Sequence, residues 1–297
     1  MFSNVKQQLD YLKSHPGFKA HPAVILFRLA IWRLLSYLRI PVSVPLRRYG
    51  LRFVLPPQWH GTSKLLYVFR DDYEPELPLL QKFLSPGRTM IDVGAHYGVY
   101  SMAASRLVHP FGAVLAFEPA ENTFSVLQRN LSVNHIENVT ALRYALSERS
   151  AKMRLYHDVD PMAYSLAPPN ATGQAQGFEE VEVRALDDVL AEKGVASVDF
   201  MKIDAEGADE LVCLGALRTL RRDKPPVFFE CHRRTASRMG LAGDGTFRLL
   251  SDEGYTFYQH RAGRLVQITA EECEGGNILA VHPDNTDLKG LKISDRS

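Results

Sequence analysis

The chain has 297 residues, of which 45% are hydrophobic and 23% are charged, and its 35 basic residues nearly balance 34 acidic ones. This composition is typical of a globular protein with a sizeable core. A net charge of +1 gives no reason to expect a nucleic-acid partner. The three cysteines, Cys213, Cys231 and Cys273, lie far apart without CxxC spacing. We therefore expect reduced thiols, the first two of them buried, and a cytoplasmic location.

The N-terminal region begins with a polar stretch, 1–19, that has no signal-peptide core. The apolar stretch 23–40 follows, and it is interrupted by three arginines: Arg28, Arg33 and Arg39. These charges argue against a membrane-spanning helix. At about 100° per residue, the arginines and Ser36 fall within one arc of roughly 140°, which leaves a broad apolar face.

Two interpretations of 23–40 remain open. The preferred one is a helix packed on the rest of the protein. The other is an interfacial helix that makes peripheral contact with an anionic membrane, with Trp32 and the arginines at the level of the lipid headgroups.

The next part of the chain, 42–70, is predicted to be a β-rich connector with strands at 42–44, 51–55 and 65–69. A helix is predicted over 75–84, before Ser85-Pro86-Gly87. This organisation suggests three parts: an N-terminal helical and β-rich segment over 1–72, a main domain over 73–285, and a polar tail over 286–297.

From Thr89 on, apolar runs alternate with helical patterns. Strands are predicted at 89–93, 113–117, 139–143, 198–203 and 226–230, and helices near 98–108, 121–134 and 207–222. Two later runs, 255–258 and 277–281, would complete the sheet as an antiparallel pair, joined by a hairpin-like segment that contains Gly263. The rhythm predicts an α/β fold with a mostly parallel sheet and helices on both faces.

The segment 151–185 departs from this alternation. Its two flanks, 153–156 and 181–184, alternate apolar and polar residues as half-exposed strands do. The region 161–178 between them lacks periodicity, so it could be a mobile loop or lid beside a site, or a plain disordered insertion.

The most informative motif is Asp92-Val93-Gly94-Ala95-His96-Tyr97-Gly98, directly after the first of these strands. The next strand ends in Glu118-Pro119. Glycines let backbone N–H groups approach a ligand, and a helix N-terminus favours an anionic group. A carboxylate on the second strand can accept hydrogen bonds from both ribose hydroxyls. The pattern therefore predicts a nucleoside-binding half-unit.

Four of the five predicted strand ends carry carboxylates. The five ends are Asp92, Glu118, Tyr144-Ala145, Asp204 and Glu230. Ligands of open α/β sheets bind beyond the carboxyl ends of the strands. Packing alone would not place these acids there, because unpaired buried carboxylates are costly.

Two cofactor classes compete for this site. A dinucleotide-binding enzyme would have G-x-G-x-x-G, whereas this turn opens with Asp92 and has different spacing. None of the twelve tyrosines has a lysine four residues later, which argues against one branch of nicotinamide enzymes. An acid-first turn with a second acid after the next strand is instead typical of an S-adenosylmethionine site. Gly94 and Ala95 would face the methionine part, and Glu118 would hold the ribose.

Several blocks in the chain resemble the FkbM-type methyltransferase family, and together they cover about 73–281. They are Phe117-Glu118-Pro119-x-x-Asn122 with Leu127-x-x-Asn130, the segment 181–190, the segment 199–209, and Val227-Phe228-Phe229-Glu230. The resemblance implies a class I (Rossmann-like) methyltransferase fold with a mostly parallel seven-stranded sheet. It also implies methyl transfer from S-adenosylmethionine, usually to an oxygen of a sugar or small natural product. Two departures are His96, where the family usually has asparagine, and Asp209, where it usually has glutamate.

The cofactor-binding residues expected from the motif, the strand ends and this resemblance are Tyr73, Glu74, Asp92, Gly94, Ala95, His96, Gly98, Glu118, Pro119, Asn122, Ala145 and Asp204. By resemblance, Tyr73-Glu74 would close over the methionine moiety. His96 would contact the cofactor carboxylate, or would be a surface histidine packed on Tyr97.

Catalysis would need a group that positions an acceptor oxygen and removes its proton. Asp204 is the first candidate, followed by Glu206, with Glu230 and His232 at the next strand end. The alternative for Asp204 and Glu206 is helix capping. Lys202 is expected to point away from Asp204 and to have a structural role. No metal is expected, although Glu230-Cys231-His232 could supply ligands together with Asp204 and Glu206.

The leading hypothesis is an S-adenosylmethionine-dependent O-methyltransferase that acts on a saccharide or a small hydroxylated metabolite. Three alternatives stay open: an N-methyltransferase, a cofactor-binding module without catalysis, and a nicotinamide enzyme.

Overall fold

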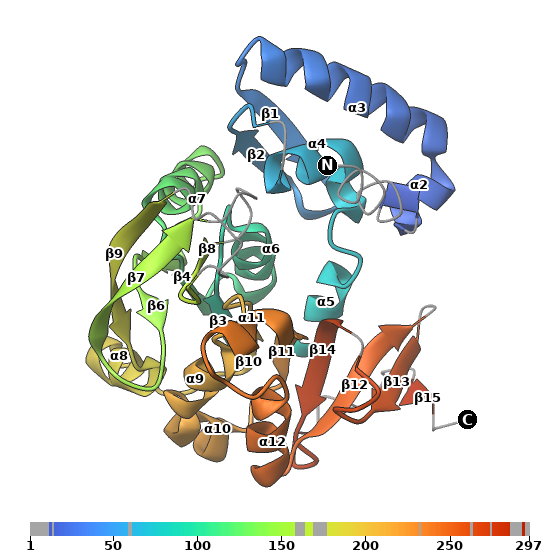
Figure 1. The fold of residues 1–297 in the computed structure, drawn as a ribbon. Coiled ribbons are helices and arrows are strands. Elements are labelled where there is room, and N and C mark those ends of the chain that lie inside the picture. The colour runs from blue at the N-terminus through green and yellow to red at the C-terminus, as the bar shows by residue number, and fades with distance from the viewer. Residues whose placement is uncertain are drawn as a thin grey trace. The chain divides into compact units, whose positions relative to one another are not determined.

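The computed structural model describes residues 12–13, 15–58, 61–157, 164–168, 177–231, 233–261, 264–273, 275–285 and 293–294. The chain divides into two units, Met1–Leu77 and Pro78–Ser297, which are described separately below (Figure 1). The three-part division predicted from the sequence stays a prediction.

The first unit combines one long helix and several short ones with a β-hairpin. Its elements are α2 (Pro16–Ala20), α3 (Pro22–Tyr37), β1 (Val42–Leu46), η1 (Arg47–Tyr49), β2 (Leu51–Leu55), α4 (Thr62–Phe69) and η2 (Arg70–Asp72). Strands β1 and β2 pair antiparallel, and burial alternates along β2 as in a strand with one face on a core. Gly50, at φ +61°, closes the turn between them in a left-handed conformation. The strands predicted at 42–44 and 51–55 are confirmed.

The strand predicted at 65–69 is wrong, because these residues form the second half of α4. A short apolar run suits a buried helix as well as a strand, and periodicity alone cannot separate them. Helix α4 begins after Gly61, whose φ of +82° redirects the chain. It then packs on α3, where the Trp32 and Tyr67 rings lie 5.0 Å apart.

The second unit is built on a sheet of nine strands among the described residues. These are β3 (Thr89–Val93), β4 (Ala113–Phe117), β5 (Val139–Leu142), β10 (Phe200–Ile203), β11 (Val227–Cys231), β12 (Thr256–Arg261), β13 (Arg264–Ile268), β14 (Gly276–Val281) and β15 (Ile293–Ser294). Their order is β15-β13-β12-β14-β11-β10-β3-β4-β5. The five strands from β11 to β5 are parallel, and β14 runs antiparallel between β11 and β12.

This sheet confirms the predicted α/β class and contains all seven predicted strands. Strands β13 and β15 extend one edge and were not predicted. The predicted antiparallel pairing of 255–258 with 277–281 is confirmed, as β12 with β14. The chain between these two strands contains β13, which also pairs antiparallel with β12, and Gly263 lies outside the described residues.

Helices cover the sheet on both sides (Figure 1). The described helices from Leu77 onward are, in chain order, η3 (Leu77–Leu79), α5 (Leu80–Phe83), α6 (Val99–Val108), α7 (Glu121–Val133), α8 (Leu186–Lys193), α9 (Asp209–Leu214), α10 (Leu217–Asp223), α11 (Arg233–Arg238) and α12 (Gly245–Asp252). The helix predicted over 75–84 is thus a short 3₁₀ turn followed by α5. The helix predicted over 207–222 is interrupted at Gly215, where a Cβ would lie 2.1 Å from the Ser147 carbonyl oxygen.

Alternation along the strands gives the sheet two different faces. One face carries the main apolar core, to which α8, α9, α10 and α12 contribute. On the other face, register aligns Asp92, Lys202 and Phe228 across β3, β10 and β11. Phe228 contacts the Tyr100 ring of α6 on that face. The sheet therefore holds a row with two charged side chains beneath α6.

A second, four-stranded sheet occupies the segment that broke the alternation. Its strands are β6 (Ala145–Leu146), β7 (Ala151–His157), β8 (Tyr164–Ser165) and β9 (Gly177–Arg184), in the order β6-β9-β7-β8. The two half-exposed strands predicted here are confirmed. Much of the predicted loop, namely 161–163 and 169–176, lies outside the described residues, as do 1–11 and most of the predicted tail.

Candidate active site

The glycine turn after β3 brings two strand ends into close contact. Gly94 has φ +73°, and a Cβ built there would lie 2.0 Å from the backbone oxygen of Asp204. Only glycine fits such an approach at this backbone conformation. The N–H groups of Gly94 and Ala95 both donate to the Phe117 carbonyl oxygen at 2.9 Å. The turn is therefore bonded to the end of β4 and packed against the end of β10.

The second glycine of the motif begins α6. Gly98 has φ +88°, and a Cβ there would lie 2.5 Å from a methyl group of Leu127 in α7. The Asn130 side-chain amide of the same helix donates to the Tyr97 carbonyl oxygen at 3.1 Å. Packing and hydrogen bonding from α7 thus hold the turn that leads into α6.

Glu118 links the two motifs predicted from the sequence. Its side chain is buried, and Oε2 accepts a hydrogen bond from the His96 backbone N–H at 2.8 Å. Oε1 accepts from the Ala120 N–H at 3.0 Å and the Thr123 hydroxyl at 2.7 Å. Burial raises the pKa of Glu118 to about 7, although these three donors act in the opposite direction.

His96 projects from the middle of the turn at φ +50°. Its ring packs on Tyr97 with centroids 4.1 Å apart, as one of the two sequence interpretations expected. Both ring nitrogens, however, are buried and have no hydrogen-bond partner among the described residues. Burial lowers the pKa of His96 to about 4, so the ring is neutral at physiological pH. A buried imidazole without partners is costly in the protein alone, and a ligand with a polar group could satisfy it.

Three charged side chains form a row on the α6 face of the sheet: Asp92, Lys202 and Asp204. Asp92 is fully buried, and its Oδ2 accepts a 2.5 Å hydrogen bond from the Ser101 hydroxyl. The Lys202 ammonium lies 3.2 Å from Asp204 Oδ2 and 4.0 Å from Asp92 Oδ1. Burial raises the pKa of Asp92, and the lysine charge opposes that shift.

The expectation that Lys202 points away from Asp204 is wrong. Residues two apart on a strand lie on the same face, so the period of a strand already predicts the contact that the structure shows. The sequence analysis gave Lys202 only a structural role and so missed its place between the two carboxylates of the site.

Asp209, and not Glu206, holds the chain at the start of α9. Its carboxylate accepts hydrogen bonds from the backbone N–H groups of Ala205 and Gly207 at 3.3 and 3.2 Å. Glu206 has φ +49°, and its carbonyl oxygen accepts from the Ser165 hydroxyl. Asp209 therefore makes capping contacts at this helix start that the sequence analysis had considered for Asp204 and Glu206.

Glu230 lies near the end of β11. The register of β10 with β11 continues from Ile203 and Phe229 to place Asp204 opposite Glu230. Both residues are half-buried. The structure thus brings Asp92, Asp204 and Glu230 to neighbouring strand ends, as the sequence predicts for a parallel sheet.

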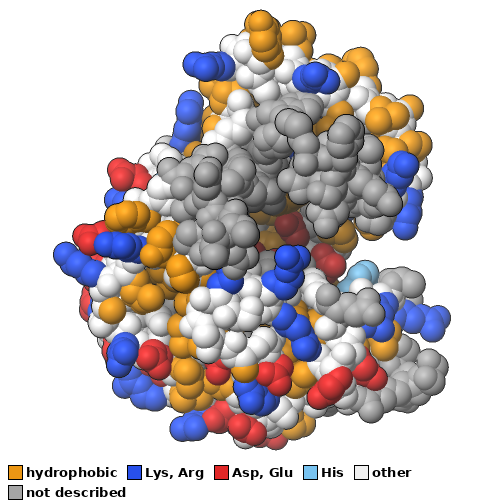
Figure 2. Space-filling view, viewed as in Figure 1, with side chains coloured by type: hydrophobic (Ala, Val, Ile, Leu, Met, Phe, Trp, Pro, Cys, Tyr) orange, Lys and Arg blue, Asp and Glu red, His pale blue; other side chains and the backbone are white. Residues whose placement is uncertain are grey.

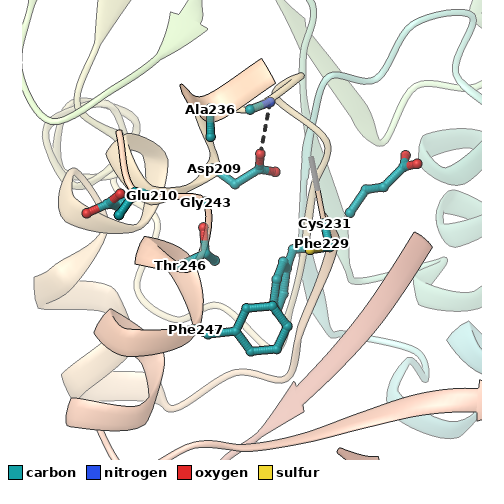
Figure 3. A pocket seen from close by; sticks show the side chains of 11 residues that line it. Asp209, Glu210, Phe229, Cys231, Ala236, Gly243, Thr246 and Phe247 are labelled. Carbon is teal, nitrogen blue, oxygen red and sulfur yellow. Dashed lines mark hydrogen bonds between the residues drawn. The ribbon is translucent and has the colours of Figure 1, made fainter. Parts of the chain in front are cut away.

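A small pocket lies on the opposite face of β11 (Figure 3). It is lined by Gly207, Asp209, Glu210, Phe229, Glu230, Cys231, Ala236, Ala242, Gly243, Thr246 and Phe247. The Phe229 and Phe247 rings meet edge to face at 5.2 Å in its floor. Cys231 is half-buried and not fully buried as predicted, whereas Cys213 is buried, and the three cysteines are thiols that are not joined in disulfides.

The remaining predicted cofactor residues are not all in this cluster. Asn122 is exposed in the first turn of α7, next to Pro119, and hydrogen-bonds the Tyr164 side chain. Ala145 is buried in β6, where it pairs with Val183. Tyr73 and Glu74 belong to the first unit. Their roles at the cofactor stay predictions.

Within the described residues, no three His, Cys, Asp or Glu side chains gather in a way that could hold a metal ion. His232, which the sequence offered as a ligand, lies outside those residues. Among the helices that the structure describes, none has the length and apolar character needed to cross a bilayer.

Comparison with known proteins identifies the family to which the chain is similar. The family model described as "Methyltransferase FkbM domain" matches residues 92–257, more than half of the chain. A 31-O-demethyl-FK506 methyltransferase FkbM from Streptomyces tacrolimicus is 30% identical over 44% of this chain and 60% of its own length. Methyltransferase 1 from Beauveria bassiana is 28% identical over 42% of this chain and 57% of its own length. The chain thus spans less than two thirds of these curated relatives. Among solved structures, the methyltransferase FkbM from Methylobacillus flagellatus is 17% identical, with a TM-score of 0.44, over 88% of this chain and 60% of its own.

Proposed function

The chain belongs to the FkbM family of S-adenosylmethionine-dependent methyltransferases, and on this premise we propose that it methylates a hydroxyl oxygen of a saccharide or a small hydroxylated metabolite. The observation that carries the proposal is the buried Glu118 carboxylate, held at the end of β4 by the backbone of the glycine turn. A nicotinamide enzyme is not compatible with the family.

The residues present fit S-adenosylmethionine. Glu118 Oε2 accepts one hydrogen bond from the protein, and a carboxylate oxygen can accept two, so it can also take one from a ribose hydroxyl. Gly94 and Ala95 would face the methionine part, in a turn whose N–H groups are held by hydrogen bonds to the Phe117 carbonyl oxygen. The buried nitrogens of His96 would find a polar partner in the cofactor. When bound, the cofactor supplies a methyl group already activated by a sulfonium.

Asp204 is the residue we assign to the acceptor. Its side chain is 32% exposed, so an alcohol can reach it, and the Lys202 ammonium holds it at 3.2 Å. A fixed carboxylate can accept a hydrogen bond from the acceptor hydroxyl and so align its oxygen for attack. When that oxygen takes the methyl group and the C–S bond of the cofactor breaks, Asp204 would accept the hydroxyl proton. Glu206 and Glu230, on the adjacent segments, are further candidates for contacts with the acceptor.

A hydroxyl acceptor has one further support. The relative from Streptomyces tacrolimicus is named for a 31-O-demethyl substrate, so methylation of an oxygen on a small molecule occurs in that protein. A cytoplasmic location, expected from reduced cysteines, remains part of the proposal.

The test is a screen for release of S-adenosylhomocysteine with sugars, glycolipid precursors and polyketide alcohols, each paired with an amine analogue. We expect turnover with an alcohol and a loss of roughly 10²-fold or more in kcat for Asp204→Asn. Asp252→Asn, an exposed acid of α12, serves as the matched control and should leave kcat unchanged. Turnover of amines alone, with little effect of Asp204→Asn, would show an N-methyltransferase and contradict the proposal.

A further inference from the structure

Helix α3 exposes an apolar face. Large side chains on it are open to solvent, with exposed fractions of 55% for Leu26, 66% for Phe27, 57% for Leu34 and 83% for Tyr37. Ala23, Ala30 and Leu38 complete the set, which we term the α3 apolar face. At about 100° per residue these seven positions occupy one arc of roughly 120°, and no polar residue falls within it. Figure 2 shows hydrophobic side chains along this helix, with basic ones among them.

The opposite side of α3 packs within the first unit. Ile25 and Trp32 are fully buried there, and the Trp32 indole N–H donates to the Gln58 carbonyl oxygen at 3.0 Å. The Arg28 guanidinium, half-buried, donates to the Val68 carbonyl oxygen of α4 at 2.8 Å. The side of α3 that carries Trp32 and Arg28 is therefore packed, so the expectation that these two residues lie at headgroup level is wrong. Arg33 and Arg39, the other arginines of the polar arc, are exposed.

This orientation is the reverse of that of an ordinary surface helix, which turns its apolar stripe inward. A contiguous exposed apolar face on a folded protein marks a site of interaction with another protein or a membrane. Packing within the described unit leaves the α3 apolar face for such a contact.

The net charge of the first unit indicates which kind of partner the α3 apolar face contacts. Residues 1–77 contain 11 Lys or Arg against 5 Asp or Glu, a net charge of +6, whereas residues 78–297 contain 24 against 29, a net charge of −5. Exposed basic residues lie beside the face and at both ends of α3: Lys19, Arg33 and Arg39. A basic unit with an apolar helical face is complementary to a lipid surface with negative headgroups.

We propose that the α3 apolar face docks on an anionic membrane surface, with the helix lying in the plane of the interface. A helix of 16 residues offers a footprint of roughly 24 by 10 Å. This is well below the area of about 800 Å² per partner that is typical of a stable protein interface, so a second copy of the chain is the weaker candidate. Insertion into lipid does not require a minimum interface area, because each apolar side chain and each basic residue adds its own contribution to the binding free energy.

Flotation of the full chain with vesicles tests the proposal. We expect the protein to float with vesicles of phosphatidylcholine mixed with phosphatidylglycerol, to remain at the bottom with phosphatidylcholine alone, and to bind less as salt is added. Phe27→Ser with Leu34→Ser should weaken the partition coefficient by at least about tenfold. Phe111→Ser, which removes an 87% exposed phenylalanine from the turn before β4, is the matched control and should have no effect.

A second measurement detects insertion directly. Tyr37→Trp places a fluorophore on the most exposed position of the face, and brominated lipid should quench its added emission. Failure of the wild type to float, or equal flotation of the Phe27→Ser/Leu34→Ser variant, would overturn the proposal. Self-association that the same two substitutions abolish, without vesicle binding, would assign the face to a second copy of the chain instead.

Discussion

The turn that joins β3 to α6 and the helix α3 depart from the usual rules of burial in opposite ways. At the turn, the second unit buries three ionisable side chains, Asp92, Glu118 and Lys202, each less than 9% exposed. At α3, the first unit exposes large apolar side chains. Buried charge and exposed apolar surface both cost free energy in the protein alone. The two proposals give each region a ligand: S-adenosylmethionine at the turn and an anionic membrane surface at the helix.

The sharpest way to break the turn is to add one methyl group. Gly94→Ala would place a Cβ 2.0 Å from the Asp204 backbone oxygen at a positive φ. We expect a loss of at least about 4 kcal/mol of unfolding free energy, measured by urea denaturation, and loss of cofactor binding. Gly194→Ala is the control, because Gly194 has a similar φ of +68° and, among the described residues, nothing within 4 Å of its Cβ. It should cost only about 1–2 kcal/mol. Equal losses in the two variants would contradict this account of Gly94.

Removing the buried cation should have the next largest effect. Lys202→Met leaves Asp92 buried beside Asp204 without its opposite charge, so the unfolding free energy should fall by about 3–5 kcal/mol. Adding Asp92→Asn should restore part of that loss. Lys193→Met, which breaks an exposed pair with Glu192, should cost less than about 1 kcal/mol. A loss for Lys202→Met no larger than that of the control would show that the charged row is not coupled.

The pH dependence of the unfolding free energy should distinguish the contribution of Glu118 from that of His96. Because burial raises the pKa of Glu118 from 4.5 to about 7, its contribution to stability is present below pH 4.5 and lost as the pH rises through 7. Because burial lowers the pKa of His96 from 6.5 to about 4, its contribution is present above pH 6.5 and lost as the pH falls through 4. Each shift corresponds to at most about 3 kcal/mol.

Two variants reveal these opposite slopes in the protein without cofactor. Relative to the wild type, Glu118→Gln should gain stability as the pH rises from about 4.5 to 7. His96→Asn, which introduces the usual family residue, should lose relative stability as the pH rises from about 4 to 6.5. Urea denaturation at a series of pH values measures both, and slopes of the same sign for the two variants would refute the assignment.

The smallest effect is expected at α3. Phe27→Ser and Leu34→Ser should each change the unfolding free energy by no more than about 0.5 kcal/mol, because these side chains already face solvent. Trp32→Ala, on the packed side of the same helix, should cost about 3–5 kcal/mol. Thermal unfolding of the three variants measures the contrast. A large loss at Phe27 would show that its ring packs against the protein and would remove the basis for a docking face.

The strands of the main sheet could be predicted because apolar runs alternate with glycine turns at regular spacing. The helix α4 could not, because a short apolar run such as Leu65–Phe69 satisfies both a strand and a buried helix. Strand β13, which lies between β12 and β15, has no comparably strong apolar pattern, and its position depends on its antiparallel pairing with β12.

The local sequence pattern also explains which parts of the candidate site could be predicted. Asp92, Glu118, Asp204 and Glu230 could be placed at strand ends because the ends of parallel strands share one edge. The hydrogen bond from the His96 N–H to Glu118 depends on the φ of +50° at His96, which no pattern specifies. The helical periodicity of α3 separates a polar arc from an apolar one, but only the packing of Trp32 on Tyr67 shows which arc faces inward.

Calorimetric titration of S-adenosylhomocysteine into the wild type and Glu118→Ala tests the central claim most directly. The account predicts one site per chain, with affinity reduced by roughly ten- to a hundredfold when the carboxylate is removed, because charge-assisted hydrogen bonds contribute about 1.5–3 kcal/mol each. Identical affinities for the two proteins, or no binding by the well-folded wild type, would contradict it.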